Sequence, residues 1–172
     1  MSNDNTIVIK DFFNEKEQNL LASAIASSKW LLQGRTSPDP SAGVFWCKRL
    51  EETEAVNLFH TKIEKGLKQK ISIESLYVNG QAHGQCGHWH QDLYPGQNYD
   101  LQHCFTLVYF PNHWLPEYGG HLMLQEDNIT SILPEYNKTV IFSSSIFHIG
   151  LEPTVFCKTQ RESIACKFRV II

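Results

Sequence analysis

From residue 71 onward, the sequence divides into short apolar segments separated by turn residues, and this division restricts the possible folds most. Segments of this length and composition predict short β-strands. Many short strands that follow two helices are typical of a helix-backed β-sandwich or jelly roll, so the expected fold class is mainly β with supporting N-terminal helices. The expected strands are residues 71–78, 86–92, 104–110, 120–125, 139–143 and 161–171.

The N-terminal part of the chain shows helical periodicity instead. A short strand is expected at residues 6–9, followed by a helix that begins after Asn14, because Glu17 three positions later completes a capping box. A second amphipathic helix is expected at 53–65, where apolar side chains recur at helical spacing. Residues 44–48 resemble a strand that lies between the two helices.

The composition fits one domain with a packed core. The chain has 172 residues, 42% of them hydrophobic, so a single domain is expected, with helical support in residues 1–70 and a β core in 71–172. A formal net charge of −3 offers no basic surface for nucleic acid. No membrane span is expected, and the N-terminus does not resemble a signal peptide. Five cysteines without a Cys-x-x-Cys pair fit free thiols in a reducing, cytoplasmic compartment.

His90 and Asp92 are the strongest candidates for metal ligands. On a strand, residues two apart point to the same face, so this pair can bind one ion together. The distant His148 would complete a set of two histidines and one carboxylate. That set leaves coordination positions open and is typical of non-haem Fe(II) oxygenases.

His88 offers an alternative metal site. It shares the face of His90 on a regular strand, so a cupin-like pair of His88 and His90 is also conceivable. A cupin site usually has a glutamate a few residues later, but this chain has Tyr94 and Pro95 there. The pair of His90 and Asp92 is therefore favoured.

The last predicted strand has two different faces. One face is apolar and suits a core, whereas the other combines cations with small residues and suits a cavity for a small anion. An arginine on that face can hold a carboxylate at two points. The apolar face carries Ile164, Cys166, Phe168 and Val170, and the polar face carries Arg161, Ser163, Ala165 and Lys167.

From about Tyr77 to the C-terminus, the chain resembles the 2-oxoglutarate- and Fe(II)-dependent dioxygenases, and within them the prolyl 4-hydroxylase-like group. The resemblance implies a double-stranded β-helix. It also implies Fe(II), 2-oxoglutarate and dioxygen, with ascorbate as a further candidate cofactor and with succinate and carbon dioxide as co-products. Five segments carry it in the family's order: Gly87–Asp92, Phe105–Asn112, Trp114–Leu122, Val140–His148 and Arg161–Ser163.

The resemblance also implies roles for individual residues. His90, Asp92 and His148 would be the catalytic metal ligands, and Arg161 with Ser163 would bind the distal carboxylate of 2-oxoglutarate. Lys158 and Lys167 are rival cations for that carboxylate.

Two positions depart from the family. One is His121, which stands where relatives often have an acidic residue, and the other lies beside the co-substrate arginine. Many prolyl hydroxylases have a tyrosine beside the co-substrate arginine, and the best register places Phe110 there. Tyr77 is then the candidate for the missing hydroxyl.

The leading functional hypothesis is hydroxylation of a prolyl residue in a peptide or protein. A free amino acid or other small molecule is the alternative substrate, and a cupin-like module without turnover is the alternative class. Nucleic-acid demethylation is disfavoured by the acidic balance. Substrate choice is expected to depend on residues 31–50 and 93–103. Residues 33–43, rich in Gly, Ser and Pro, are a candidate lid, because prolyl hydroxylases have a mobile segment at the equivalent place.

Overall fold

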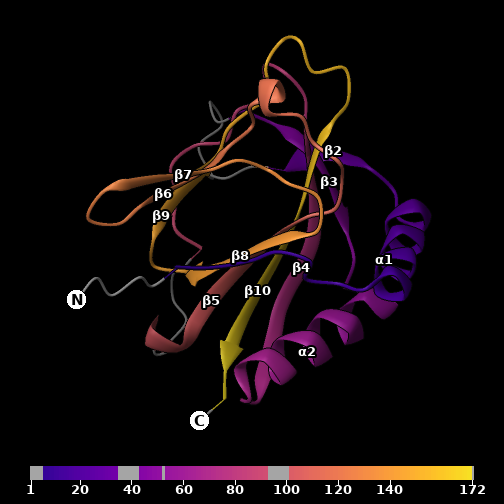
Figure 1. Cartoon of the computed structure of the whole chain (residues 1–172), viewed down its shortest axis with the longest axis vertical. Coiled ribbons are helices and arrows are strands. Elements are labelled where there is room, and N and C mark those ends of the chain that lie inside the picture. The colour runs from indigo at the N-terminus through magenta and orange to yellow at the C-terminus, as the bar shows by residue number, and fades with distance from the viewer. Residues whose placement is uncertain (1–5, 35–42, 52, 93–100, 172) are drawn as a thin grey trace.

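The protein is described here by a computed structural model, which covers residues 6–34, 43–51, 53–92 and 101–171. Within these ranges the strands form two antiparallel sheets, a seven-stranded sheet in the order β1-β8-β5-β10-β4-β3-β2 and a three-stranded sheet in the order β7-β6-β9 (Figure 1). The fold is the jelly roll, or double-stranded β-helix, that the strand pattern predicts. The strands are β1 Thr6–Ile9, β2 Leu31–Gly34, β3 Phe45–Arg49, β4 Ile71–Gln81, β5 Cys104–Phe110, β6 Leu122–Gln125, β7 Ile129–Ile132, β8 Lys138–Ser143, β9 Phe147–Gly150 and β10 Arg161–Val170.

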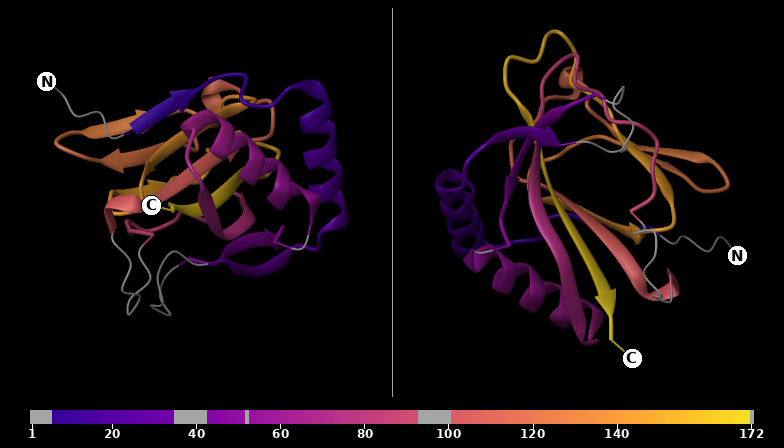
Figure 2. Two further views of the ribbon diagram at one scale, coloured as in Figure 1. Left: turned by 90° about the horizontal axis from the view of Figure 1, so that it is seen from below. Right: turned by 180° about the vertical axis from the view of Figure 1, so that it is seen from behind.

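Two helices cover the outer face of the large sheet (Figure 2). Helix α1 spans Glu15–Ser27, and the predicted capping box is confirmed. The Asn14 side chain accepts a bond from the Glu17 N–H at 3.0 Å, and the Glu17 carboxylate accepts one from the Asn14 N–H at 2.8 Å. Helix α2 spans Glu54–Leu67 and ends where Lys68 adopts φ 56°. No helix in the described part of the chain is long and apolar enough to cross a membrane.

The main core lies between the helices and the large sheet. Its aromatic centre includes Phe13, whose ring centroid is 5.1 Å from that of Phe59 on α2 and 5.1 Å from that of Tyr109 on β5. Strand β10 contributes its predicted apolar face to this core, since Ile164, Cys166 and Phe168 are fully or almost fully buried there. These contacts bury the residues that drive folding on one side of the sheet.

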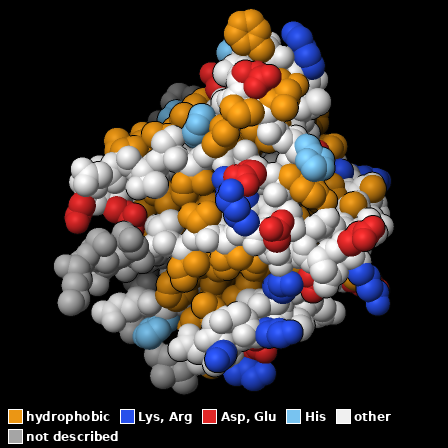
Figure 3. All heavy atoms as spheres, viewed as in Figure 1, with side chains coloured by type: hydrophobic (Ala, Val, Ile, Leu, Met, Phe, Trp, Pro, Cys, Tyr) orange, Lys and Arg blue, Asp and Glu red, His pale blue; other side chains and the backbone are white. Residues whose placement is uncertain are grey.

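A second apolar cluster lies between the two sheets and closes one end of the jelly roll. It joins β5 and β8 of the large sheet to β6 and β7 of the small sheet, through Val108, Phe110, Leu122, Leu124, Ile132, Val140, Phe142 and Ile146. On the face drawn in Figure 3, basic and acidic side chains are interspersed, and hydrophobic side chains gather near the edge strand β1. The space between the sheets is thus apolar at one end and open at the other.

The structure corrects several predicted boundaries. Residues 86–92 do not form a regular strand, because the chain passes here from the large sheet toward the small sheet. Among them only His90 makes a bridge, to His148. Strands β2, β7 and β9 were not predicted, and Gln33 and Gly34 of the expected loop belong to β2. Of the rest of the candidate lid, Gly43 is described, and residues 35–42 lie outside the described residues.

Candidate metal centre and cavity

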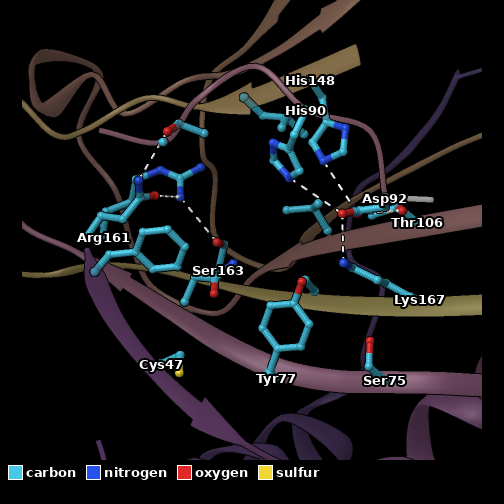
Figure 4. Close-up of a pocket in the computed structure, with 18 of the residues that line it drawn as sticks. Cys47, Ser75, Tyr77, His90, Asp92, Thr106, His148, Arg161, Ser163 and Lys167 are labelled. Atoms are coloured by element: carbon cyan, nitrogen blue, oxygen red, sulfur yellow. Dashed lines mark hydrogen bonds and ion pairs between the residues drawn. The ribbon is translucent and has the colours of Figure 1, made fainter. Parts of the chain in front are cut away.

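Three side chains converge at the open end of the jelly roll, although they come from different parts of the chain. His90 and Asp92 lie in the segment after β4, and His148 lies on β9 (Figure 4). Asp92 Oδ1 is 3.5 Å from His90 Nε2, and Asp92 Oδ2 is 3.5 Å from His148 Nε2. One nitrogen or oxygen from each residue lies within 4.8 Å of the others, close enough to bind one ion.

Backbone pairing brings these residues together. The N–H of His90 donates to the carbonyl of His148 at 3.0 Å, and the N–H of His148 donates to the carbonyl of His90 at 2.9 Å. The N–H of Asp92 donates to the carbonyl of Ser144 at 3.0 Å. The bridge between His90 and His148 and two further backbone bonds, from Gly87 to Gly150 and from Asp92 to Ser144, therefore replace the regular strand that the sequence predicts.

Both imidazoles present the nitrogen that a metal needs. His90 Nδ1 lies 2.8 Å from the carbonyl oxygen of His88, and His148 Nδ1 lies 3.0 Å from that of Ile146. Because a carbonyl oxygen only accepts hydrogen bonds, each Nδ1 carries the proton and each Nε2 keeps its lone pair. Such outer contacts are what orient histidine ligands in metal proteins.

Asp92 is held as a charged carboxylate. Its Oδ2 accepts a hydrogen bond from Thr106 Oγ1 at 2.8 Å, and Lys167 Nζ lies 2.8 Å from its Oδ1. Burial alone raises the pKa of Asp92, but contacts with the rings of His148 and His90 and the charge of Lys167 outweigh it, so the pKa lies well below its usual range. Two imidazoles and one ionised carboxylate are a donor set that suits Fe(II).

His88 lies apart from this group. The residue is exposed, and its carbonyl oxygen supports His90. The described residues that could hold an ion together are His90, Asp92 and His148. The geometry thus favours this set over the cupin-like pair.

Arg161 is a buried cation among neutral groups. It is 2% exposed, and its Nε–H donates to the Gly120 carbonyl at 2.6 Å. Its Nη1 donates to Gln81 Oε1 at 2.8 Å and to Ser163 Oγ at 3.2 Å. Burial lowers the pKa of Arg161 to about 10, which still leaves it protonated at neutral pH. A buried cation of this kind calls for an anion, and none of the described carboxylates pairs with it.

The surroundings of Arg161 differ in part from the predicted ones. Phe110 lies beside the guanidinium as predicted, with its ring centroid 5.6 Å from Arg161 Cζ. Gln81, opposite Arg161 in the strand pairing, supplies the polar contact, whereas Tyr77 lies opposite Ala165. Sequence reasoning missed Gln81 and Thr106, because only the strand register reveals their places.

A cavity of about 590 Å³ connects these groups. It lies between the sheets, and its walls come mainly from β3, β4, β5 and β10. The six residues predicted to bind the metal or the co-substrate all line it, and the rival cation Lys167 lines it too: Tyr77, His90, Asp92, His148, Arg161, Ser163 and Lys167. Lys158, one of the rival cations, is exposed instead.

A jelly roll that holds two histidines and a carboxylate at its open end defines a class, the metal-dependent oxygenases of this fold. Residues 75–169 match the family model described as the 2OG-Fe(II) oxygenase superfamily. The match covers more than half of the chain, and the protein belongs to this superfamily. The family implies Fe(II), 2-oxoglutarate and dioxygen. No curated protein matches the chain.

Solved structures of low sequence identity share the fold. A prolyl hydroxylase from Trichoplax adhaerens, in complex with a hypoxia inducible factor peptide fragment, is 16% identical with a TM-score of 0.73, over 97% of this chain and 84% of that chain. The viral collagen prolyl hydroxylase of Paramecium Bursaria Chlorella virus-1, in complex with 2-oxoglutarate, is 16% identical with a TM-score of 0.66, over 99% and 98%. The epimerase SnoN from nogalamycin biosynthesis is 10% identical with a TM-score of 0.69, over 95% and 77%.

Proposed function

We propose that this protein is an Fe(II)- and 2-oxoglutarate-dependent hydroxylase that acts on prolyl residues of a peptide or protein. The observation that carries the proposal is the convergence of His90, Asp92 and His148 within 4.8 Å. Both histidines keep a free Nε2, and the carboxylate stays ionised. When bound there, iron and 2-oxoglutarate supply the oxidation of the substrate by dioxygen, with succinate and carbon dioxide as co-products.

The chain's own residues bind and orient the reactants. In this proposal Arg161 holds the distal carboxylate of 2-oxoglutarate with a charge-assisted contact, and Ser163 supports the guanidinium through its hydroxyl. Phe110 and Gly120 pack around the arginine and exclude water from it. Tyr77 remains a candidate contact, since it lines the same cavity.

The choice of a prolyl substrate rests on similarity of fold. Two of the similar structures are prolyl hydroxylases, one of them with a peptide bound. A small-molecule substrate is the second candidate, and it is supported by the similar fold of the epimerase SnoN from nogalamycin biosynthesis and by the many polar residues that line the cavity. A peptide needs an open cavity that admits an extended chain, whereas a small molecule can be enclosed entirely.

The metal assignment can be tested with a matched pair of variants. Asp92→Ala removes a charged ligand, so the affinity for Mn(II) under anaerobic conditions should fall by more than about 100-fold. His88→Ala keeps the backbone carbonyl that supports His90, so its affinity should stay within about threefold of the original. Metal titration that gives the reverse order would establish the cupin-like site instead.

Turnover separates an oxygenase from a binding module. Protein loaded with Fe(II) and supplied with ascorbate should convert 2-oxoglutarate to succinate, and a matching substrate should accelerate this conversion. A panel of proline-containing peptides, free amino acids and small molecules identifies the substrate kind by the mass gain of one oxygen atom. Absence of succinate with every member of the panel would leave a non-catalytic metal-binding module.

A further inference from the structure

The cavity has a second cationic end that the proposed binding of 2-oxoglutarate does not use. Lys167 follows Arg161 by six residues on the same strand and the same face, which separates their Cα atoms by about 20 Å. Asp92, the candidate metal ligand, lies beside Lys167 rather than beside Arg161 (Figure 4). A five-carbon diacid that extends from Arg161 to the metal therefore leaves the space at Lys167 for another molecule.

Strand pairing places polar groups next to Lys167. Ser75 on β4 is directly opposite Lys167, and both line the cavity. In the neighbouring row, Arg49 on β3 is opposite Tyr77, which is in turn opposite Ala165. In Figure 4, Ser75 and Tyr77 rise from the same strand toward this space. The floor of this end is thus polar across three strands.

One buried polar atom on this floor, Ser75 Oγ, lacks a partner within the described residues, and Ser75 lines the cavity. A second such atom of the cavity wall, Asn79 Oδ1, lies at the other end, because Asn79 is opposite Ser163. An unsatisfied buried polar atom destabilises the fold, so its retention in a cavity wall points to a polar ligand. A hydroxyl such as that of Ser75 can donate to an anion.

The charges of the cavity favour an anionic ligand as well. Its described walls carry three cationic side chains, those of Arg49, Arg161 and Lys167, and two acidic ones, those of Glu51 and Asp92. Arg49 and Glu51 form an ion pair at 3.7 Å. The charges of a divalent metal ion and of doubly charged 2-oxoglutarate would cancel, so the three cations and two carboxylates of the walls leave one net positive charge. An anionic substrate would balance it.

We propose that the substrate to be hydroxylated carries a carboxylate, which Lys167 and Ser75 bind at the end of the cavity opposite Arg161. This inference rests on the proposed function, since it assigns the other end to 2-oxoglutarate. The carboxylate has two possible sources, an acidic residue next to the target residue in a peptide or the free carboxylate of an amino acid. In either case Lys167 is a specificity-determining residue.

The test uses protein loaded with Mn(II) and 2-oxoglutarate under anaerobic conditions, with probes in matched pairs. One pair is L-proline and L-prolinamide, and the other is acetyl-Ala-Asp-Pro-Asp-Ala-amide and its counterpart with Asn at both Asp positions. In one of the two pairs, the carboxylate probe should bind roughly ten- to a hundredfold more tightly than its amide counterpart. The pair that shows this preference identifies whether the carboxylate belongs to a free amino acid or to an acidic residue of a peptide. Lys167→Met should reduce this preference to below about twofold, and Ser75→Ala should reduce it by roughly two- to tenfold. Lys158→Met, which changes an exposed lysine, should keep it.

Metal affinity provides an independent measurement. Lys167→Met should raise the affinity for Mn(II), because it removes a cation that lies 2.8 Å from the ligand carboxylate. A fall would mean that the lysine serves to position Asp92, and it would overturn the proposal. Equal binding within both pairs, no binding of either carboxylate probe, or a loss of 2-oxoglutarate affinity in Lys167→Met would also overturn it. The proposed function fails separately, if the original protein binds neither Mn(II) nor 2-oxoglutarate.

Discussion

The two faces of the large sheet are built by opposite rules, and strand β10 shows both. Its even-numbered residues Ile164, Cys166 and Phe168 are at most 2% exposed and pack against the core beneath the helices. Four of its odd-numbered residues, Arg161, Ser163, Ala165 and Lys167, line the cavity. Arg161 is just as deeply buried there but has neutral hydrogen-bond partners. Burial of apolar side chains on the first face stabilises the protein. On the second face, burial leaves the cation Arg161 without an anionic partner, so this site calls for an anionic ligand.

Stability and ligand binding depend on different faces of the large sheet. On the core face, apolar contacts can be replaced only at a cost in folding free energy. On the cavity face, buried polar groups contribute little or unfavourably to folding, because their charges are desolvated. The comparison therefore predicts that substitutions on the two faces of one strand separate loss of stability from loss of binding.

The largest effect is expected on the core face. Phe168→Ala removes a ring that is 2% exposed and lies 5.7 Å from the ring of Phe105, so the free energy of unfolding should fall by about 3–5 kcal/mol. The folded fraction should keep its affinity for Mn(II). Urea denaturation measures the first quantity and metal titration the second. A loss below about 1 kcal/mol would contradict the division between the faces.

The second effect is expected at Arg161. Arg161→Ala should weaken the binding of 2-oxoglutarate to Mn(II)-loaded protein by roughly ten- to a hundredfold, because a charge-assisted contact is worth about 1.5–3 kcal/mol. Arg161→Lys keeps the charge without the two-point geometry and should be intermediate. The free energy of unfolding should change by less than about 1 kcal/mol, since a desolvated cation is removed. Anaerobic titration that shows normal binding in Arg161→Ala but loss in Lys167→Ala would assign the co-substrate to the other end.

The fold was predictable where local patterns are strong. The capping box at Asn14 and Glu17 and the alternation of β10 depend on neighbouring residues, so the sequence contains them. The segment 86–92 was misassigned as a strand, because its pairing with β9 depends on a distant part of the chain. Strand β7, with three of its four residues exposed, has too little apolar alternation to be recognised.

The candidate site was predictable where the residue types themselves indicate a kind of chemistry. Histidine, aspartate and arginine at the right spacing indicate a metal and an anion. Thr106 and Gln81 give no such signal, since a threonine or glutamine is common on any strand. Their roles follow from tertiary pairing, which places Thr106 opposite Lys167 and Gln81 opposite Arg161.

The third effect tests the support of Arg161 with two neighbouring glycines. Both have positive φ, 62° at Gly119 and 67° at Gly120, so alanine at either position should cost about 1–2 kcal/mol of unfolding free energy. A Cβ on Gly120 would meet Arg161 Cδ at 2.8 Å, whereas one on Gly119 would meet Thr154 Cγ2 at 3.1 Å. Only Gly120→Ala should therefore weaken 2-oxoglutarate binding, by roughly tenfold. Equal binding by the two variants would mean that the guanidinium adjusts freely.

A smaller effect is expected at Ser163, beside the apolar Ile164. Ser163→Ala removes the hydroxyl that accepts from Arg161 at 3.2 Å and should weaken 2-oxoglutarate binding by roughly two- to tenfold, or about 0.5–1.5 kcal/mol. Ile164→Val, a matched change on the core face, should leave that affinity intact and lower the unfolding free energy by about 0.5–1.5 kcal/mol. Affinity loss in both variants would show that the two faces are coupled.

The smallest effect is expected at the ion pair between the two helices. It tests whether this ion pair adds to the apolar contacts that hold the helices on the sheet. Glu17 of α1 contacts Lys62 of α2 at 2.9 Å. Burial raises the pKa of Glu17, but the bond to Asn14 and the contact with Lys62 together lower it by more, so the pKa lies below its usual value. A group with a lowered folded pKa stabilises the fold above its unfolded pKa, and that stability is lost as the pH falls through the folded value. Glu17→Gln should thus cost about 0.2–1 kcal/mol at pH 7 and nothing at pH 3, as measured by urea denaturation. A cost that is the same at both pH values would trace the effect to the capping box instead.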